Sequence, residues 1–155
     1  MKLQGCIART VFWLLLIIGL AGCGSSTIKI EGNIQTSQGI NPDHAGRPSP
    51  VVIRVYQLRS PGPFMNADFF DLYDNAVATL GQNLIISEEF ELRPGEAREY
   101  NTKFEKAAKY VGVIAAFRDL ENARWREVLM LPDKKKVHLH IILDDLAVSV
   151  STGKR

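Results

Sequence analysis

Two histidines, His138 and His140, form an H-x-H pair in a stretch of alternating apolar residues near the C-terminus. Because side chains alternate across a strand, both imidazole rings are expected on one face, where they could bind a metal ion together. The spacing supplies no third ligand, however, and Val137, Leu139 and Ile141 indicate the buried face of a strand. We therefore favour histidines that face solvent, and keep a site for a metal or small ligand as the alternative.

Three aspartates, Asp68, Asp71 and Asp74, recur at three-residue intervals in a segment with helical periodicity. A site for a divalent cation is one interpretation. The alternating oxygen ligands and central glycine of a calcium loop are absent from this segment. The pattern favours a solvated acidic helix face, with Asp68 stabilised near the helix N-terminus by the helix dipole.

Three consecutive lysines, Lys134 to Lys136, precede the histidine-bearing strand. Such a run is typical of a solvated turn, and lysines also protect an exposed sheet edge from pairing with another chain. Contact with anionic headgroups or with a partner protein is the alternative. The sequence contains no nucleophile elbow, HExxH zinc motif, P-loop or dinucleotide fingerprint, so we do not expect an enzyme or a bound cofactor.

The N-terminal segment has the composition of an export signal. Lys2 and Arg9 provide a basic start, and residues 11–20 form an apolar run. That run is too short to cross about 30 Å of hydrocarbon as a helix. The segment ends at Cys23, directly after small residues.

Leu20-Ala21-Gly22-Cys23 resembles the lipobox of bacterial lipoproteins. The resemblance implies a diacylglycerol on the Cys23 thiol, cleavage after Gly22 and an acylated amino terminus. Because several acyl chains anchor a protein stably, the mature chain is expected to be tethered to a membrane without crossing it. Gly24 stands where an aspartate would retain such a protein at the inner membrane, so we expect the outer membrane. An ordinary secretory signal or a short signal anchor is the alternative.

Composition limits the remaining functions. Lys2 and Arg9 account for the formal charge of +2, so the chain after the signal has equal numbers of basic and acidic residues. Without a basic excess, nucleic acid is not an expected partner. Cys6 falls in the signal and Cys23 is used by lipid, so no disulfide or thiolate metal site is expected. We expect a signal peptide at 1–22, a lipidated tether at 23–26 and one domain at 27–155.

The pattern after the tether predicts a mainly β domain. Period-two alternation and turn residues indicate about eight short strands, and one segment capped by Asn66 and ending near Gly81 has helical spacing. The expected fold is an antiparallel β-sandwich with one inserted helix. The expected strands are 28–35, 51–58, 84–92, 97–104, 109–117, 124–131, 136–143 and 145–150.

A long irregular segment, Ser37 to Pro50, separates the first two expected strands. It is rich in glycine and proline and has no apolar periodicity. Hairpin loops usually have about two to five residues, and much longer connections are often functional. We therefore expect this loop to carry a binding function.

Several stretches, in order along the chain, resemble the TssJ family, the outer-membrane lipoproteins of the type VI secretion system. They are Val52–Leu58, Phe64–Tyr73, Leu80-Gly81, Leu92–Gly95, Tyr110–Leu120 and Trp125-Arg126. The resemblance implies a transthyretin-like sandwich with an added helix, held at the periplasmic face of the outer membrane.

The resemblance also implies a non-catalytic role. Members of this family bind the periplasmic C-terminal part of TssM, an inner-membrane protein, largely through the loop between the first two strands. That loop corresponds to Ser37–Pro50 here. The resemblance gives the location of the contact and not its residues. Our candidates within the loop are Asn41, Pro42, Asp43, His44 and Arg47.

Two other functions stay open from the residues alone. One is a lipoprotein that binds a small ligand or a metal through His138 and His140. The other is a pilotin or assembly factor of a different envelope machine.

Overall fold

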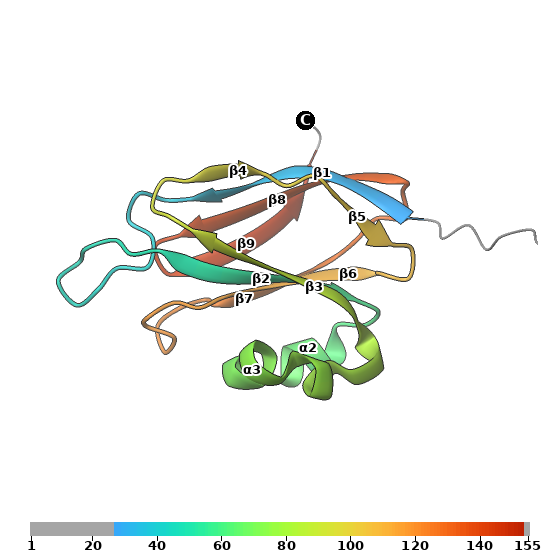
Figure 1. Cartoon of the computed structure of the whole chain (residues 1–155), viewed down its shortest axis with the longest axis horizontal. Helices are drawn as coiled ribbons and strands as arrows, with labels where there is room; N and C mark the ends of the chain where they lie inside the picture. Colours follow the sequence, from blue (N-terminus) through green and yellow to red (C-terminus); the bar gives the residue numbers. More distant parts are fainter. Residues whose placement is uncertain (1–26, 154–155) are drawn as a thin grey trace, which may run out of the picture.

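The computed structural model describes residues 27–153, which form two β-sheets packed face to face, with two helices on the outer side of one sheet (Figure 1). Residues 1–26, including the expected signal, Cys23 and tether, lie outside the described residues. The elements are β1 (Thr27–Thr36), β2 (Val51–Leu58), α2 (Gly62–Asn66), α3 (Phe69–Leu80), a 3-10 turn (Gly81–Asn83), β3 (Leu84–Leu92), β4 (Ala97–Glu99), β5 (Thr102–Glu105), β6 (Tyr110–Ala115), β7 (Arg126–Met130), β8 (Lys136–Asp144) and β9 (Ala147–Thr152).

The first sheet is built around β1 and β8. Its order is β4-β1-β8-β9, and β5 pairs with the first part of β1 while β4 pairs with the last part. β1 and β8 run parallel, whereas every other pairing between the described strands is antiparallel. Parallel neighbours need a long connection, and here that connection contains the whole second sheet, both helices, and the strands β4 and β5. The predicted sandwich is confirmed, with this one parallel pair inside it.

The second sheet has the order β3-β2-β6-β7 and is antiparallel throughout. β6 lies between β2 and β7. Val111 and Val113 of β6 are buried against the first sheet, and Ile114 is buried on the other face, beneath the helices. The first six residues of the apolar run at 110–117 therefore form a central strand that is covered on both sides, as the composition predicts.

The core between the sheets follows from the alternation seen in the sequence. In β8, Val137 and Leu139 are buried at 3% and 0% exposure, whereas His138 and His140 are half-buried on the opposite face. β1 approaches β8 closely at Gly32, where a Cβ would lie only 1.7 Å from the backbone oxygen of Leu139. Only glycine fits at this position.

The helices α2 and α3 pack on the outer face of the second sheet. Phe64 and Leu72, both fully buried, cover Tyr56, whose hydroxyl donates a hydrogen bond to the Leu72 carbonyl at 2.8 Å. Arg126 of β7 donates to the carbonyls of Phe64 and Ala67 at 3.0 and 2.7 Å. These bonds satisfy carbonyls that the short helix α2 leaves free.

Three local expectations differ from the structure. Asp68, not Asn66, caps α3, because its carboxylate accepts the Asp71 N–H at 2.8 Å while Asn66 ends α2. The strand expected at 97–104 is divided into β4 and β5 by Tyr100-Asn101. The lysine run does not guard an edge, since β8 lies between β1 and β9.

Candidate functional site

The loop Ser37–Pro50 projects from one end of the sandwich and carries the chain from the first sheet to the second (left in Figure 1). β1 begins at the opposite end of the molecule. At about 3.3 Å per residue, the ten residues of β1 place its start and the base of the loop roughly 30 Å apart. The loop and the entry of the chain thus mark two opposite poles.

Asn41 fixes the base of this loop. It is only 3% exposed and has a positive φ of 52°, which asparagine tolerates better than most residues. Its side-chain amide donates to the Pro50 carbonyl at 2.7 Å and its oxygen accepts the Arg118 N–H at 2.8 Å. Its backbone N–H donates to the Asp145 carbonyl at 2.8 Å. Because Arg118 follows β6 and Asp145 joins β8 to β9, Asn41 links the two sheets.

The tip of the loop is closed by Asp43 and Arg47. The Asp43 carboxylate accepts the backbone N–H groups of Ala45 and Arg47, each at 2.9 Å, and pairs with the Arg47 guanidinium at 2.7 Å. These contacts lower the pKa of Asp43 below its usual range, and the hydrogen bonds from Arg47 have the largest effect. Gly46, with a φ of 74°, supplies the turn between them. The tip is therefore ordered before any partner binds.

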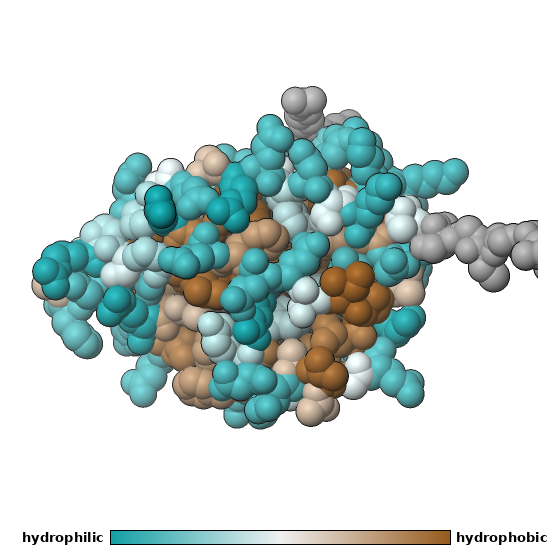
Figure 2. Space-filling view, in the orientation of Figure 1, coloured by the Kyte–Doolittle hydropathy of each residue, from teal (hydrophilic) through white to brown (hydrophobic). Residues whose placement is uncertain are grey.

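Behind the tip lies a hollow of about 640 Å³, lined by Pro42, Asp43, His44, Arg118, Asp119 and Leu146. Its walls come from the loop, the segment after β6 and the β8–β9 turn. The imidazole of His44 and the guanidinium of Arg118 are exposed at its rim. The hollow offers both charges and hydrogen-bond donors to a protein surface. Figure 2 shows this end of the molecule as largely hydrophilic.

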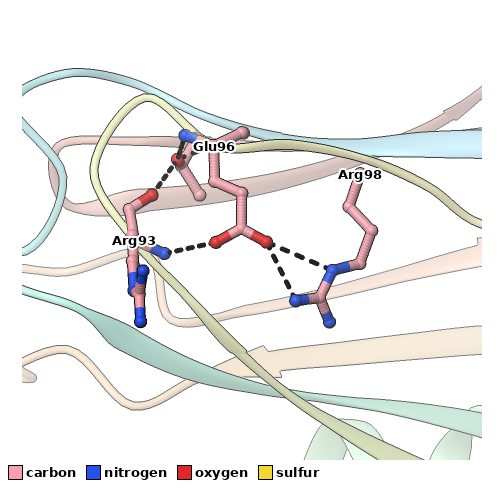
Figure 3. Close-up of polar contacts among 4 residues, drawn as sticks. Arg93, Glu96 and Arg98 are labelled. Atoms are coloured by element: carbon pink, nitrogen blue, oxygen red, sulfur yellow. Dashed lines mark hydrogen bonds and ion pairs between the residues drawn. The ribbon is translucent and has the colours of Figure 1, made fainter.

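The β3–β4 turn supports the loop from the side, and Figure 3 shows its polar contacts. The Glu96 carboxylate accepts the Arg93 backbone N–H at 2.9 Å and pairs with the Arg98 guanidinium at 2.9 Å. These contacts lower the pKa of Glu96, and the hydrogen bond from the Arg93 N–H has the largest effect. The turn reaches the loop where the Gly95 N–H donates to the Ser37 carbonyl at 3.0 Å.

The structure therefore brings four of the five loop candidates together at the surface, namely Pro42, Asp43, His44 and Arg47, and places Asn41 inside. Sequence reasoning missed Arg118 and Asp119, which are distant in the chain. The only available signal was the turn chemistry around 119–122. Which of these residues contacts a partner stays a prediction.

The other chemical candidates remain apart from this loop. His138 and His140 lie on the outer face of β8, and His140 Nδ1 is hydrogen-bonded to the Asn33 side-chain oxygen. Within residues 27–153, no group of three or more His, Cys, Asp or Glu side chains is arranged to hold a metal ion. Asp68 serves as the helix cap, while Asp71 and Asp74 are exposed.

The expected lipid-attachment residue, Cys23, lies outside the described residues. Over the described range 27–153, neither helix has the length and apolar character needed to cross a membrane.

A family model described as "Type VI secretion lipoprotein, VasD, EvfM, TssJ" matches residues 28–146. This range begins one residue after the start of β1 and includes the loop, both helices and every other strand except β9, which follows it. No curated protein matches the chain.

Solved structures resemble the fold over nearly their whole length. The T6SS lipoprotein TssJ1 from Pseudomonas aeruginosa is 35% identical, with a TM-score of 0.80 and coverage of 83% of this chain and 98% of that chain. Lip from Serratia marcescens, a membrane-bound component of the type VI secretion system, is 27% identical, with a TM-score of 0.75 and coverage of 83% and 99%. A chain in the structure described as the T6SS protein TssM C-terminal domain (869–1107) from EAEC is 27% identical, with a TM-score of 0.64 and coverage of 79% and 97%.

Proposed function

The chain belongs to the TssJ family of type VI secretion lipoproteins, and from this premise we propose that it links the outer membrane to the periplasmic C-terminal part of a TssM-type inner-membrane protein. The role is mechanical and not catalytic. Lipid on Cys23 holds one pole of the sandwich, and the loop Ser37–Pro50 binds the partner at the other pole.

The membrane anchor rests on the lipobox. Leu20-Ala21-Gly22-Cys23 supplies the cleavage and acylation site, and Gly24 favours the outer membrane. Several acyl chains on one residue give stable anchoring, since each buried methylene contributes about 0.8 kcal/mol. The family match supports a membrane-bound lipoprotein.

The choice of partner is supported by the structure that contains the TssM C-terminal domain. The chain matched there is close in length to the aligned part of this chain, because 79% of this chain covers 97% of it. It is much shorter than the TssM span 869–1107, and we infer that it is a second protein accompanying TssM. A TssM-type protein is therefore our proposed partner for this chain.

We assign the binding site to the loop because its contacts hold it in one conformation. Asp43 and Arg47 close the tip, and Asn41 joins the base to both sheets. Ordering a loop before binding reduces the conformational entropy that association must overcome. His44 and Arg47 are exposed on this rigid tip, which makes them our first candidates for direct contact. Asn41 acts by holding the loop in place.

The test is calorimetry of the mature lipoprotein in detergent with the periplasmic C-terminal part of its TssM-type protein. Deleting the whole loop Ser37–Pro50 should abolish binding, but it also removes Ile40 and Asn41, which are buried. The sharper variant is therefore His44→Ala with Arg47→Ala, which alters the tip alone.

We expect this double variant to weaken binding by about ten-fold or more, as loss of a central contact does. The matched control is Phe70→Ala with Val77→Ala, at positions 63% and 77% exposed on α3. The control should bind within about three-fold of the wild type. Undiminished affinity in the loop variant, or loss only in the helix variant, would overturn the assignment of the loop.

A further inference from the structure

A groove of about 890 Å³ lies at the pole where β1 begins, opposite the loop Ser37–Pro50. Thr27 and Ile28 line it, together with the turns after β2, between β5 and β6, and between β7 and β8. Met130, which is 65% exposed, and Pro132 contribute apolar surface. We call this feature the entry groove.

Cations surround the entry groove. Five basic residues line it against a single carboxylate, Asp133; they are Arg59, Lys106, Lys109, Lys134 and Lys135. The ion pairs found within residues 27–153 join other groups and use none of these five. Each of the five is exposed. Their charges are available to an external anion.

The lysines are segregated to this pole. Lys103 and Lys136 both lie opposite Lys29, near the start of β1. Together with the four groove lysines, these are all the lysines of residues 27–153. The loop pole carries arginines instead, among them Arg47 and Arg118. Among the acids near this pole, Glu31 is paired with Lys29 and Lys136. Glu105, opposite Thr27, and Asp133 are the others, so basic residues outnumber acidic residues at this pole.

The length of the preceding chain brings this pole to a membrane. Thr27 is the fourth residue after Cys23, and a fully extended chain over those four steps spans at most about 14 Å. Charges interact over roughly 8 Å at physiological ionic strength. If Cys23 carries lipid, as proposed above, Thr27, which lines the groove, stays within about two such lengths of Cys23.

We propose that the entry groove binds anionic phospholipid headgroups of the leaflet that holds the lipid on Cys23. Lysine stems can lie along apolar surface while the ammonium groups reach phosphate oxygens, and Met130 and Pro132 enter the interface. This contact orients the domain. It directs the loop Ser37–Pro50 away from the membrane, toward its partner.

The experiment uses the lipidated mature protein in vesicles that contain headgroup-attached quencher. A fluorophore is placed at Met130→Cys in the groove or at Val77→Cys, a control position of similar exposure on α3. One set of vesicles contains phosphatidylglycerol and phosphatidylcholine, and the other phosphatidylcholine alone. The expected result is at least about three-fold stronger quenching at position 130 than at position 77, only with phosphatidylglycerol, and decreasing with added salt.

Charge variants test the cause. Each lysine at an anionic surface favours contact by about five-fold, so Lys134→Glu with Lys135→Glu should reduce the groove contact by more than about ten-fold. The matched control, Arg47→Glu with Arg118→Glu, makes the same change in net charge at the loop pole and should leave quenching at position 130 unchanged. Circular dichroism and thermal melting confirm that the variants fold.

Equal quenching at positions 130 and 77 overturns the proposal. A fluorophore at position 130 that is also protected from solvent in phosphatidylcholine vesicles or in detergent overturns the proposal, because a segment of protein would then occupy the groove. A protein that fails to stay on vesicles at all refutes both the anchor and the groove contact. A protein that stays on vesicles with position 130 unquenched refutes only the groove contact.

Discussion

Replacing Asn41 by alanine tests the claim that the loop Ser37–Pro50 is held in place by one buried side chain. The substitution removes the bonds from Asn41 to the Pro50 carbonyl and the Arg118 N–H, at 2.7 and 2.8 Å. It also places an alanine at a φ of 52°. The bond from the Asn41 backbone to Asp145 can persist, so the effect comes from the side chain and the backbone strain.

The expected loss of stability is the sum of the two lost hydrogen bonds and the backbone strain. Each hydrogen bond contributes about 1 kcal/mol to the free energy of unfolding, and left-handed backbone costs alanine about 1 kcal/mol more than asparagine. Asn41→Ala should therefore lower the free energy of unfolding by about 3 kcal/mol. For a domain of this size, that corresponds to a fall in Tm of roughly 10 °C. Asn41→Gly relieves the strain and should lose about 2 kcal/mol.

The assay is chemical denaturation of the two variants beside the wild type, followed by calorimetry with the TssM-type partner. Asn41→Asp retains the acceptor for the Arg118 N–H but sets a buried carboxylate oxygen against the Pro50 carbonyl, so it should lose at least as much stability as Asn41→Gly. Weaker partner binding by all three variants is expected because the loop base loosens. An Asn41→Ala protein within about 0.5 kcal/mol of the wild type, with unchanged partner affinity, would refute the reasoning.

Gly32→Ala should destabilise the protein by at least about 3 kcal/mol, because its Cβ would lie 1.7 Å from the Leu139 oxygen, whereas Gly62→Ala, with open space around it, should be tolerated in the same denaturation assay. Glu31→Gln should lower Tm at neutral pH: ion pairs with Lys136 and Lys29 lower the pKa of Glu31 from 4.5 to about 2, so the stabilisation is present above pH 4.5 and is lost as pH falls toward 2. Between pH 4.5 and 2, Tm should therefore fall less steeply with pH in Glu31→Gln than in the wild type, and an equal fall in both proteins would contradict this. Cys23→Ser should leave an uncleaved or mislocalised precursor and stop secretion, and normal outer-membrane fractionation would argue against the lipid anchor.

Local patterns predicted most of the strands. β2 and β3 have the expected bounds, because alternation and flanking turn residues are encoded in neighbouring positions. The expected burial of Val137 and Leu139 is confirmed for the same reason, as is the outward placement of His138 and His140. The helix α3 was also recognisable from its spacing.

Features that depend on distant residues could not be predicted in this way. The parallel pairing of β1 with β8 joins segments separated by most of the chain, and no local signal reports it. Arg118 and Asp119 join the loop site only because the two sheets meet there. Asparagine is a good cap, so the sequence predicts Asn66 as the cap of α3, but Asn66 is the last residue of α2 and Asp68 caps α3 instead.

Composition predicts that this loop is irregular, but it does not predict the contacts within the loop. Prolines and glycines indicate an irregular segment and do not reveal that Asp43 closes on Arg47 or that Asn41 is buried. The sequence therefore located the candidate site, whereas the structure separates residues that hold the loop from residues that it presents.

Site-specific photo-cross-linking in intact cells tests the central claim most directly, namely that the pole opposite the lipid anchor binds the TssM-type protein. A photoreactive residue is placed at His44 on the loop tip or at Val77 on α3, both of which are exposed. The expected result is a cross-link to the TssM-type protein from position 44 and none from position 77. A cross-link from position 77 alone would contradict the account.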